Sequence, residues 1–267
     1  MTTQPLSGRR VLAGKRILIT RAVHQAGRLS EGLRALGAEP VEVPVLEIQP
    51  PAGYDAIDLA LRRLNSRLDT YDWLVLTSAN TVRAFTERAA ELGLPLAPPA
   101  SLKVAAIGEG TASAARKAGL PVTVIPSAYV AEAMVEALAG QARGQRFLLA
   151  RAEVARDVIV DALRGVGAKV HVVDAYRNVM PENAPMALRA ALDKHIDAVT
   201  FTSSSSVTHL AEAARLAAID FPFRGVAAVS IGPITSKTLR EVGWEPAAEA
   251  SPSHLAGLIA AVKLALC

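Results

Sequence analysis

Short turns with small hydroxyl residues recur along the chain where an apolar run ends and a helical pattern begins. The hydroxyl residues at these turns are Ser78, Thr111, Ser203, Ser204 and Thr235. In an α/β sheet such turns lie at the carboxyl ends of strands, where hydroxyls and free helix N–H groups can hold an anion. The same residues could instead be helix N-caps, which stabilise a helix by about 1 kcal/mol each. Anion binding and simple capping therefore both stay open for these five, whereas Ser127 and Ser251 are predicted to be caps only.

Two arginines occupy equivalent positions at the ends of predicted strands. Arg21 follows the apolar run Arg16–Thr20, and Arg151 follows Arg146–Ala150. A guanidinium group can hold a carboxylate through two parallel hydrogen bonds, and its alternative role here is a surface ion pair. Arg21 is the stronger candidate for binding a carboxylate.

Other kinds of chemistry lack the residues that they need. The Gly108–Ser113 turn has the first two glycines of a dinucleotide fingerprint but not the third, and the serine run 202–206 lacks the glycines of a nucleophile elbow. The five histidines show no metal-ligand spacing, and Cys267 is the only cysteine. The sequence predicts no metal site, no cofactor and no disulfide framework.

Composition narrows the class of protein further. The 267 residues are enough for two domains of ordinary size, and a content of 51% hydrophobic but only 4% aromatic residues suits helices packed on parallel sheets. The formal net charge of +4 favours anionic partners, while the scarcity of aromatic residues argues against nucleic acid. No apolar run reaches the roughly 18 residues of a membrane span, so we expect a cytoplasmic protein without a membrane segment.

An internal duplication organises the chain. Residues 15–46 align without gaps on residues 145–176, a shift of 145 − 15 = 130 positions. A second match pairs 72–78 with 197–203, and a third pairs the segment that ends at Thr111 with the one that ends at Thr235. Three matches in the same order indicate a duplicated unit.

Each copy alternates short apolar runs with helical stretches, which predicts parallel sheets covered by helices on both faces. Predicted strands are 16–20, 73–77, 103–107, 121–125, 146–150, 197–202, 226–231 and 245–248. Predicted helices lie near 24–36, 80–92, 111–118, 129–139, 155–166, 204–217, 234–242 and 253–264. Glycines at 37, 93, 119, 167 and 243 follow helical stretches as left-handed C-caps should. Segments 41–48 and 170–179 are predicted to be extended connectors between domains.

An ordered set of motifs resembles the uroporphyrinogen III synthase family over about residues 15–264. The motifs are the strand end at Ile17–Arg21, the turns Leu76–Asn80 and Thr202–Ser204, the segment Ile231–Thr235, and Tyr176 in the second connector. The resemblance implies two similar flavodoxin-like domains, each a parallel β-sheet flanked by helices, joined by a two-strand β connector. The first domain would comprise 1–43 and 177–267, the inserted second domain 47–172, and the connectors 44–46 and 173–176. Glu109 stands where the second copy has Pro233, a departure in one half of the pattern.

The resemblance also implies an activity without a cofactor. The family closes the linear tetrapyrrole hydroxymethylbilane to uroporphyrinogen III with loss of water, as a hydro-lyase, and inverts the terminal pyrrole ring in a cleft between the domains. Tyr176 would be the proton donor, and Arg21, Ser78, Ser203, Ser204 and Thr235 would hold the carboxylate arms. A packed hinge tyrosine is the alternative for Tyr176.

Partners and rival functions follow from the same residues. The resemblance implies an anionic small-molecule substrate, transient contact with the enzyme that supplies the bilane, a monomeric state, and neither nucleic acid nor membrane as a partner. The main rival is a non-catalytic two-domain protein that binds an anionic small molecule. A nucleotide-dependent enzyme that uses the Gly108 turn is a third possibility.

Overall fold

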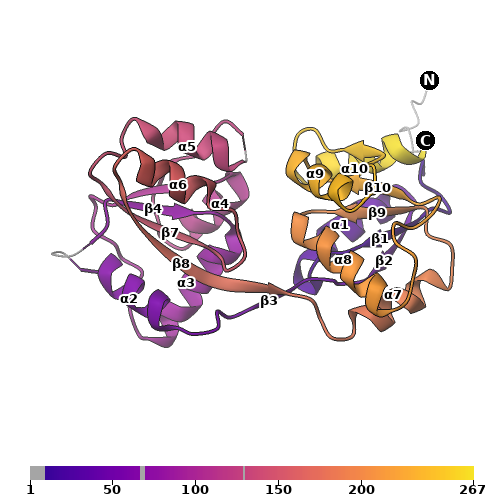
Figure 1. Cartoon of the computed structure of the whole chain (residues 1–267), viewed down its shortest axis with the longest axis horizontal. Coiled ribbons are helices and arrows are strands. Elements are labelled where there is room, and N and C mark those ends of the chain that lie inside the picture. The colour runs from indigo at the N-terminus through magenta and orange to yellow at the C-terminus, as the bar shows by residue number, and fades with distance from the viewer. Residues whose placement is uncertain (1–9, 67–69, 129) are drawn as a thin grey trace, which may run out of the picture. The chain divides into compact units, whose positions relative to one another are not determined.

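The computed structural model describes residues 10–66, 70–128 and 130–267 and divides the chain into two compact units. Unit 1 contains the chain up to Glu47 and again from Val179 to Cys267, and unit 2 is Ile48–Asn178. Figure 1 labels the elements of both units. The exact domain boundaries given above stay a prediction.

Unit 1 contains a parallel five-stranded sheet in the order β11-β10-β9-β1-β2. Its strands are β1 (Arg16–Ile19), β2 (Glu39–Glu42), β9 (Ala198–Phe201), β10 (Ala227–Ser230) and β11 (Ala248–Glu249). Its helices are α1 (Val23–Ala35), α7 (Ala184–Leu192), α8 (Ser204–Leu216), α9 (Pro233–Glu241) and α10 (Leu255–Leu266). The neighbours β1, β9 and β10 are parallel, so their carboxyl ends lie at one edge of the sheet.

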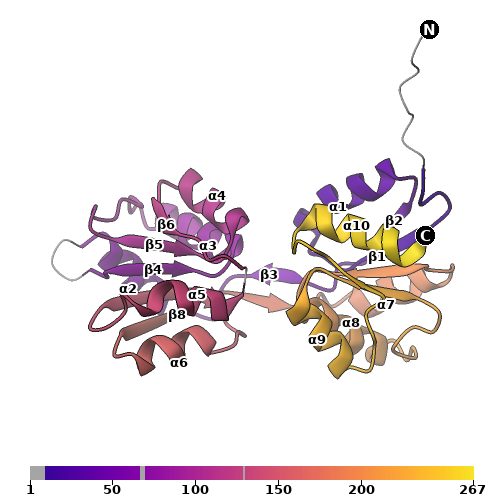
Figure 2. The same cartoon turned by 90° about the horizontal axis from the view of Figure 1, so that it is seen from above.

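The side chains of β1 alternate between two apolar clusters, as the two-residue period of a strand requires. Ile17 and Ile19 pack with residues of α1 and α10, whereas Leu18 packs with residues of α7, α8 and α9. Figure 2 shows α1 and α10 on one side of this sheet and α8 and α9 on the other. Unit 1 is therefore a three-layer sandwich with its core on both faces of the sheet.

Unit 2 contains a six-stranded sheet in the order β3-β8-β7-β4-β5-β6. Its strands are β3 (Glu47–Gln49), β4 (Trp73–Leu76), β5 (Lys103–Ala106), β6 (Val122–Val124), β7 (Arg146–Ala152) and β8 (Lys169–Val179). Its helices are α2 (Asp55–Leu64), α3 (Ala79–Glu91), α4 (Glu109–Lys117), α5 (Ala131–Ala139) and α6 (Val158–Gly165). Buried residues of α2, α3 and α4 cover one face of the sheet, and those of α5 and α6 cover the other.

The predicted fold class, α/β with mostly parallel sheets flanked by helices, is confirmed. The five predicted C-cap glycines all have positive φ values. At Gly37, with φ +91°, an added Cβ would also lie 2.7 Å from the Cβ of Arg10. Glycine is therefore required at this turn for its backbone conformation and for its lack of a side chain.

The structure corrects several element predictions. Helices α2 and α7 were missed, and the segment predicted to be a connector at 41–48 begins inside β2, which pairs with β1. The second such segment, 170–179, lies within β8, which pairs with β7 as far as Tyr176. Residues 43–46 lie between β2 and β3 and belong to neither strand, so the predicted connector 44–46 stays a prediction.

Candidate functional site

In unit 2, two of the predicted site residues, Tyr176 and Ser78, are in direct contact. Tyr176 lies on β8 and is 7% exposed, and the Ser78 hydroxyl donates a hydrogen bond to the Tyr176 hydroxyl oxygen over 3.1 Å. Ser78 is also the N-cap of α3, where its Oγ accepts the backbone N–H of Thr81 at 3.1 Å. Ser78 thus caps a helix and contacts Tyr176 at once, and this arrangement leaves the phenolic proton of Tyr176 available to another acceptor.

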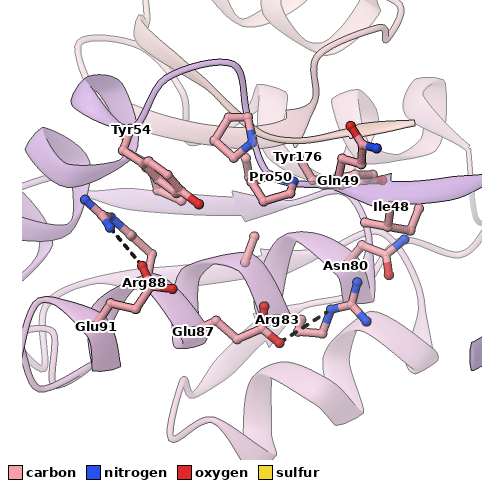
Figure 3. A pocket seen from close by; sticks show the side chains of 14 residues that line it. Ile48, Gln49, Pro50, Tyr54, Asn80, Arg83, Glu87, Arg88, Glu91 and Tyr176 are labelled. Atoms are coloured by element: carbon pink, nitrogen blue, oxygen red, sulfur yellow. Dashed lines mark hydrogen bonds and ion pairs between the residues drawn. The ribbon is translucent and has the colours of Figure 1, made fainter. Parts of the chain in front are cut away.

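A pocket in unit 2 includes Tyr176 in its lining. One wall is the segment Ile48–Pro51 together with Tyr54, and the other is the face of α3 that carries Asn80, Arg83 and Glu87. The pocket encloses about 520 Å³ of empty space, part of it open to solvent. Figure 3 shows Tyr54 and Pro50 on one side and the α3 side chains on the other. Tyr176 therefore lies beside a space that could admit part of a ligand.

Arg151 is occupied by ion pairs within the protein. Its guanidinium lies 2.7 Å from Asp157 Oδ1 and 3.5 Å from Asp174 Oδ1, and its side chain is 14% exposed. Two carboxylates already neutralise this cation, so the ion-pair alternative holds for Arg151. A second pocket, beside Arg151, also has Arg156 in its lining, and Arg156 is paired with Glu132.

Arg21 has a different environment in unit 1. It lies in the turn between β1 and α1, and its Nη2 donates a hydrogen bond to the amide oxygen of Gln25 over 3.3 Å. Its Nε is buried and has no hydrogen-bond partner among the described residues. Burial lowers the pKa of Arg21 from its ordinary value, because a charged group loses solvation there. Within the described part of the chain no carboxylate forms an ion pair with it, so an anionic ligand would supply the missing partner.

The other three predicted residues of unit 1 lie at the ends of β9 and β10. Ser203 is the N-cap of α8 in a reciprocal capping box with Ser206, and Ser204 accepts a hydrogen bond of 2.7 Å from Thr238. Thr235 is 4% exposed in the first turn of α9. Because β1, β9 and β10 are neighbours, the structure brings Arg21, Ser203, Ser204 and Thr235 to one edge of one sheet. Ser78 and Tyr176 form a separate set in unit 2.

The capping role holds for Ser78 and Ser203 and fails for the other candidates. The N-caps of α4 and α9 are Gly108 and Gly232, so Thr111 and Thr235 lie inside helices. Ser127 and Ser251 are not caps, contrary to the prediction: α5 begins after Val130 and α10 after His254. The His254 ring accepts the backbone N–H of Gly257 at 3.0 Å, a capping role that only the structure reveals.

The helices α4 and α9 each have a glycine as the N-cap residue. Gly232 has no side chain to cap α9, and an added Cβ would lie 2.6 Å from Ser253 Oγ. The backbone N–H groups of the first turn are therefore not covered by a capping side chain, which suits an anion. Sequence reasoning singled out this turn for Thr235 but did not recognise the role of the glycine.

Sequence reasoning also missed the pocket residues Tyr54 and Arg83. Asn80 belongs to one of the hydroxyl turns, and Arg83 follows it three positions later on the same helix face. The three-residue spacing between Asn80 and Arg83 could have indicated that Arg83 lies near the turn. Tyr54 offered none, because the helix α2 that begins after it was not predicted.

The described residues contain no group of three or more His, Cys, Asp or Glu side chains that could hold a metal ion. In the same part of the chain, none of the helices has both the length and the apolar character of a membrane span.

Comparisons with known proteins agree on one family. A family model for uroporphyrinogen-III synthase HemD matches residues 27–260. A uroporphyrinogen-III synthase of Synechococcus elongatus is 36% identical over 94% of this chain and 96% of its own length. A putative uroporphyrinogen-III synthase of Methanothermobacter thermautotrophicus is 32% identical over 84% of this chain and 88% of its own length.

Solved structures agree on the fold. A mutant uroporphyrinogen III synthase from Thermus thermophilus matches with a TM-score of 0.64 at 22% identity, covering 95% of this chain and 99% of that one. The corresponding protein of Helicobacter pylori matches with a TM-score of 0.60 at 16% identity, over 92% and 97% of the two chains. With sequence similarity over most of its length and the same fold, this chain belongs to the uroporphyrinogen-III synthase family.

Proposed function

We propose that this protein cyclises hydroxymethylbilane to uroporphyrinogen III, with loss of water and inversion of the terminal pyrrole ring. The observation that carries the proposal is family membership over residues 27–260, together with 36% identity to a uroporphyrinogen-III synthase. The family name implies an enzyme of tetrapyrrole synthesis, and the reaction makes it a hydro-lyase. The rival, a non-catalytic binding protein, is not favoured by any of these relatives.

Tyr176 is the proposed proton donor. Protonation of the leaving hydroxyl by the phenol would release water and leave an electron-poor methylene on the first ring. Attack by the substituted carbon of the terminal ring would give a spiro intermediate, whose rearrangement inverts that ring; the closed macrocycle then loses the proton that restores the phenol. The Ser78 hydrogen bond to the Tyr176 oxygen supports this role, because it would stabilise the phenolate that forms.

The residues at the carboxyl edge of the unit 1 sheet are the proposed holders of carboxylate arms. Arg21 would form a charge-assisted pair, and the hydroxyls of Ser203, Ser204 and Thr235 would add hydrogen bonds beside the α8 and α9 N-termini. Ser78 would contribute from unit 2. The bilane also closes without inversion in solution, so the main task is to hold its ends in the right order.

Four further expectations belong to the same proposal. The protein would act in the cytoplasm as a monomer, without a cofactor, and would receive its unstable substrate through transient contact with the enzyme that makes it. The formal net charge of +4 supports an anionic substrate.

The test is the isomer that the purified protein produces. Hydroxymethylbilane generated enzymatically is added, the products are oxidised, and uroporphyrins I and III are separated by chromatography. A predominance of type III supports the proposal. Type I alone, formed at the spontaneous rate by protein whose circular dichroism shows it to be folded, contradicts it.

A further inference from the structure

The pocket of unit 2 has one cation that internal carboxylates hold only loosely. Among its described lining residues, Arg88 is fully engaged: it contacts both oxygens of Asp58 at 2.7 and 2.8 Å and Glu91 at 2.8 Å. Arg83 makes only a 3.8 Å contact with Glu87, and the two side chains are 39% and 67% exposed. An exposed pair at this distance contributes little stability, so a ligand carboxylate can take Arg83 from Glu87.

The walls of this pocket suit a flat ring. Pro50 and Tyr54 lie on one side and Ala84 on the other, with the Arg88 guanidinium 4.0 Å from the centre of the Tyr54 ring. Arg177 fixes the first wall, because its Nε donates to the Pro50 carbonyl at 3.0 Å and its Nη2 to the Gln49 amide oxygen at 3.3 Å. Figure 3 shows that the labelled Arg83 and Glu87 extend from α3 opposite Tyr54 and Pro50.

The duplicated unit shows that this space depends on one small residue. The match of Ser78 with Ser203, a shift of 125 positions, places Ala84 opposite His209 of α8 (209 − 84 = 125). In unit 1 the His209 ring Nδ1 lies 2.9 Å from the Val45 carbonyl oxygen, so this side chain bridges from α8 to the segment after β2. Alanine at the equivalent position of unit 2 cannot make that bridge, and a pocket lies there instead.

We propose that this pocket binds a single pyrrole ring of the linear substrate, with Arg83 holding one of its carboxylate arms. The inference rests on the proposed function and deepens it. The pocket lies between the segment Ile48–Pro51 and one face of α3, a setting that suits one ring with its arms. The ring would lie against Tyr54 and Pro50, and Glu87, released from Arg83, would accept a hydrogen bond from the pyrrole N–H. Because Tyr176 also lines the pocket, the bound ring is the first one, which carries the leaving hydroxyl.

The charges of the pocket exclude a more strongly anionic occupant. Glu87 and Glu91 lie on the same wall as Arg83, and a ligand with clustered negative charges, such as a polyphosphate, would face both carboxylates. A ring with spaced carboxylates and an N–H donor matches the pair of Arg83, which binds a carboxylate, and Glu87, which accepts the N–H. The pocket therefore selects a monopyrrole unit by its mixture of charges.

The first test measures binding without turnover. A soluble monopyrrole that bears one acetate and one propionate arm is titrated into the full-length protein and followed by isothermal calorimetry. Saturable binding is expected. Arg83→Gln should weaken it by about tenfold, and Ala84→His, which introduces the side chain of unit 1, should abolish it. Arg116→Gln, at an exposed arginine paired with Glu109, is the matched control and should bind like the wild type.

Absence of binding in the wild type would overturn the inference, and so would equal affinity in the wild type, Arg83→Gln and Ala84→His. Arg83 is partly exposed, so its variant should fold even if Ala84→His does not. In the isomer assay, Arg83→Gln should raise KM about tenfold with a smaller change in kcat; an unchanged KM also counts against the pocket. A wild type that binds the monopyrrole yet forms no type III isomer would instead contradict the proposed function.

Discussion

The two units are alike at the amino ends of their strands and different at the carboxyl ends. In unit 1 the Asp197 carboxylate accepts the backbone N–H of Arg16 at 2.8 Å, and in unit 2 Asp72 accepts that of Arg146 at 2.7 Å. Both aspartates precede a central strand and join it to the equivalent neighbour. The duplication has therefore preserved a contact that holds each sheet together.

At the carboxyl ends the equivalent residues have taken different partners. Arg21 has a buried Nε without a partner among the described residues, while its counterpart Arg151 is paired with two aspartates. The shift of 130 positions that relates these two arginines also places Tyr176 opposite Leu46. The difference teaches that copies of one unit can divide the work at equivalent positions: in our proposal Tyr176 of unit 2 donates the proton, and Arg21, but not its counterpart Arg151, binds a carboxylate.

The largest expected effect comes from removing the hydroxyl of Tyr176, which has no counterpart at Leu46 of the other copy. Tyr176→Phe keeps the ring in its cluster and should slow turnover by more than about tenfold, because the leaving hydroxyl loses its proton donor. Rates of type III formation are compared at equal folded fraction. An undiminished rate would leave Tyr176 as a packed tyrosine, the alternative role, and would remove the proposed division of work.

Replacing each arginine by glutamine tests whether the two copies differ in carboxylate binding. Arg21→Gln should raise KM by about tenfold, because a substrate carboxylate loses its charged partner. Arg151→Gln is the matched control and should leave KM within about twofold, since its charge already faces Asp157 and Asp174. Equal effects of the two substitutions on KM would show that the ion pairs of Arg151 do not make its role different from that of Arg21.

The smallest effect, a change in stability that depends on pH, is expected at the contact between Asp197 and the backbone N–H of Arg16. Burial raises the pKa of Asp197, but the Arg16 backbone N–H and the Lys15 ammonium together outweigh burial, so the pKa lies below its ordinary value of 3.8. A lowered folded-state pKa stabilises the protein above the unfolded value, and this contribution is lost as pH falls through the folded value. Asp197→Asn should cost about 1 kcal/mol near neutral pH.

Urea unfolding of the wild type and Asp197→Asn across acid pH measures this contribution. The difference in unfolding free energy should be constant at neutral pH and shrink below about pH 4. If the difference in unfolding free energy persists at lower pH, the effect comes from altered packing or hydrogen bonding and not from the charge of Asp197. Asp72→Asn provides the comparison with the other copy of this contact.

Much of the fold was predictable because local rules dominate it. Apolar runs of four or five residues predicted β1, β4 and β9 to within two residues at each end, and glycine after a helix marked each of the five left-handed C-caps. Helix α7 was missed because the stretch around it was assigned to no element. The caps predicted at Ser127 and Ser251 were wrong, because a serine caps only when the following N–H groups point at it, and the N-cap residues of those helices lie three residues later.

The sequence by itself determined the duplication, the alternating strands and helices, the hydroxyl turns and the family, because these depend on residue type and spacing. Tertiary structure decided which polar groups are already satisfied. Arg21 and Arg151 are equivalent in the sequence, yet only packing surrounds one with aspartates and buries the Nε of the other without a partner among the described residues. The pocket beside Tyr176 likewise arises from β3, α3 and β8, which lie far apart in the chain. Spacing along a chain fixes the face on which a side chain lies, but only the packing of distant segments determines what that side chain meets.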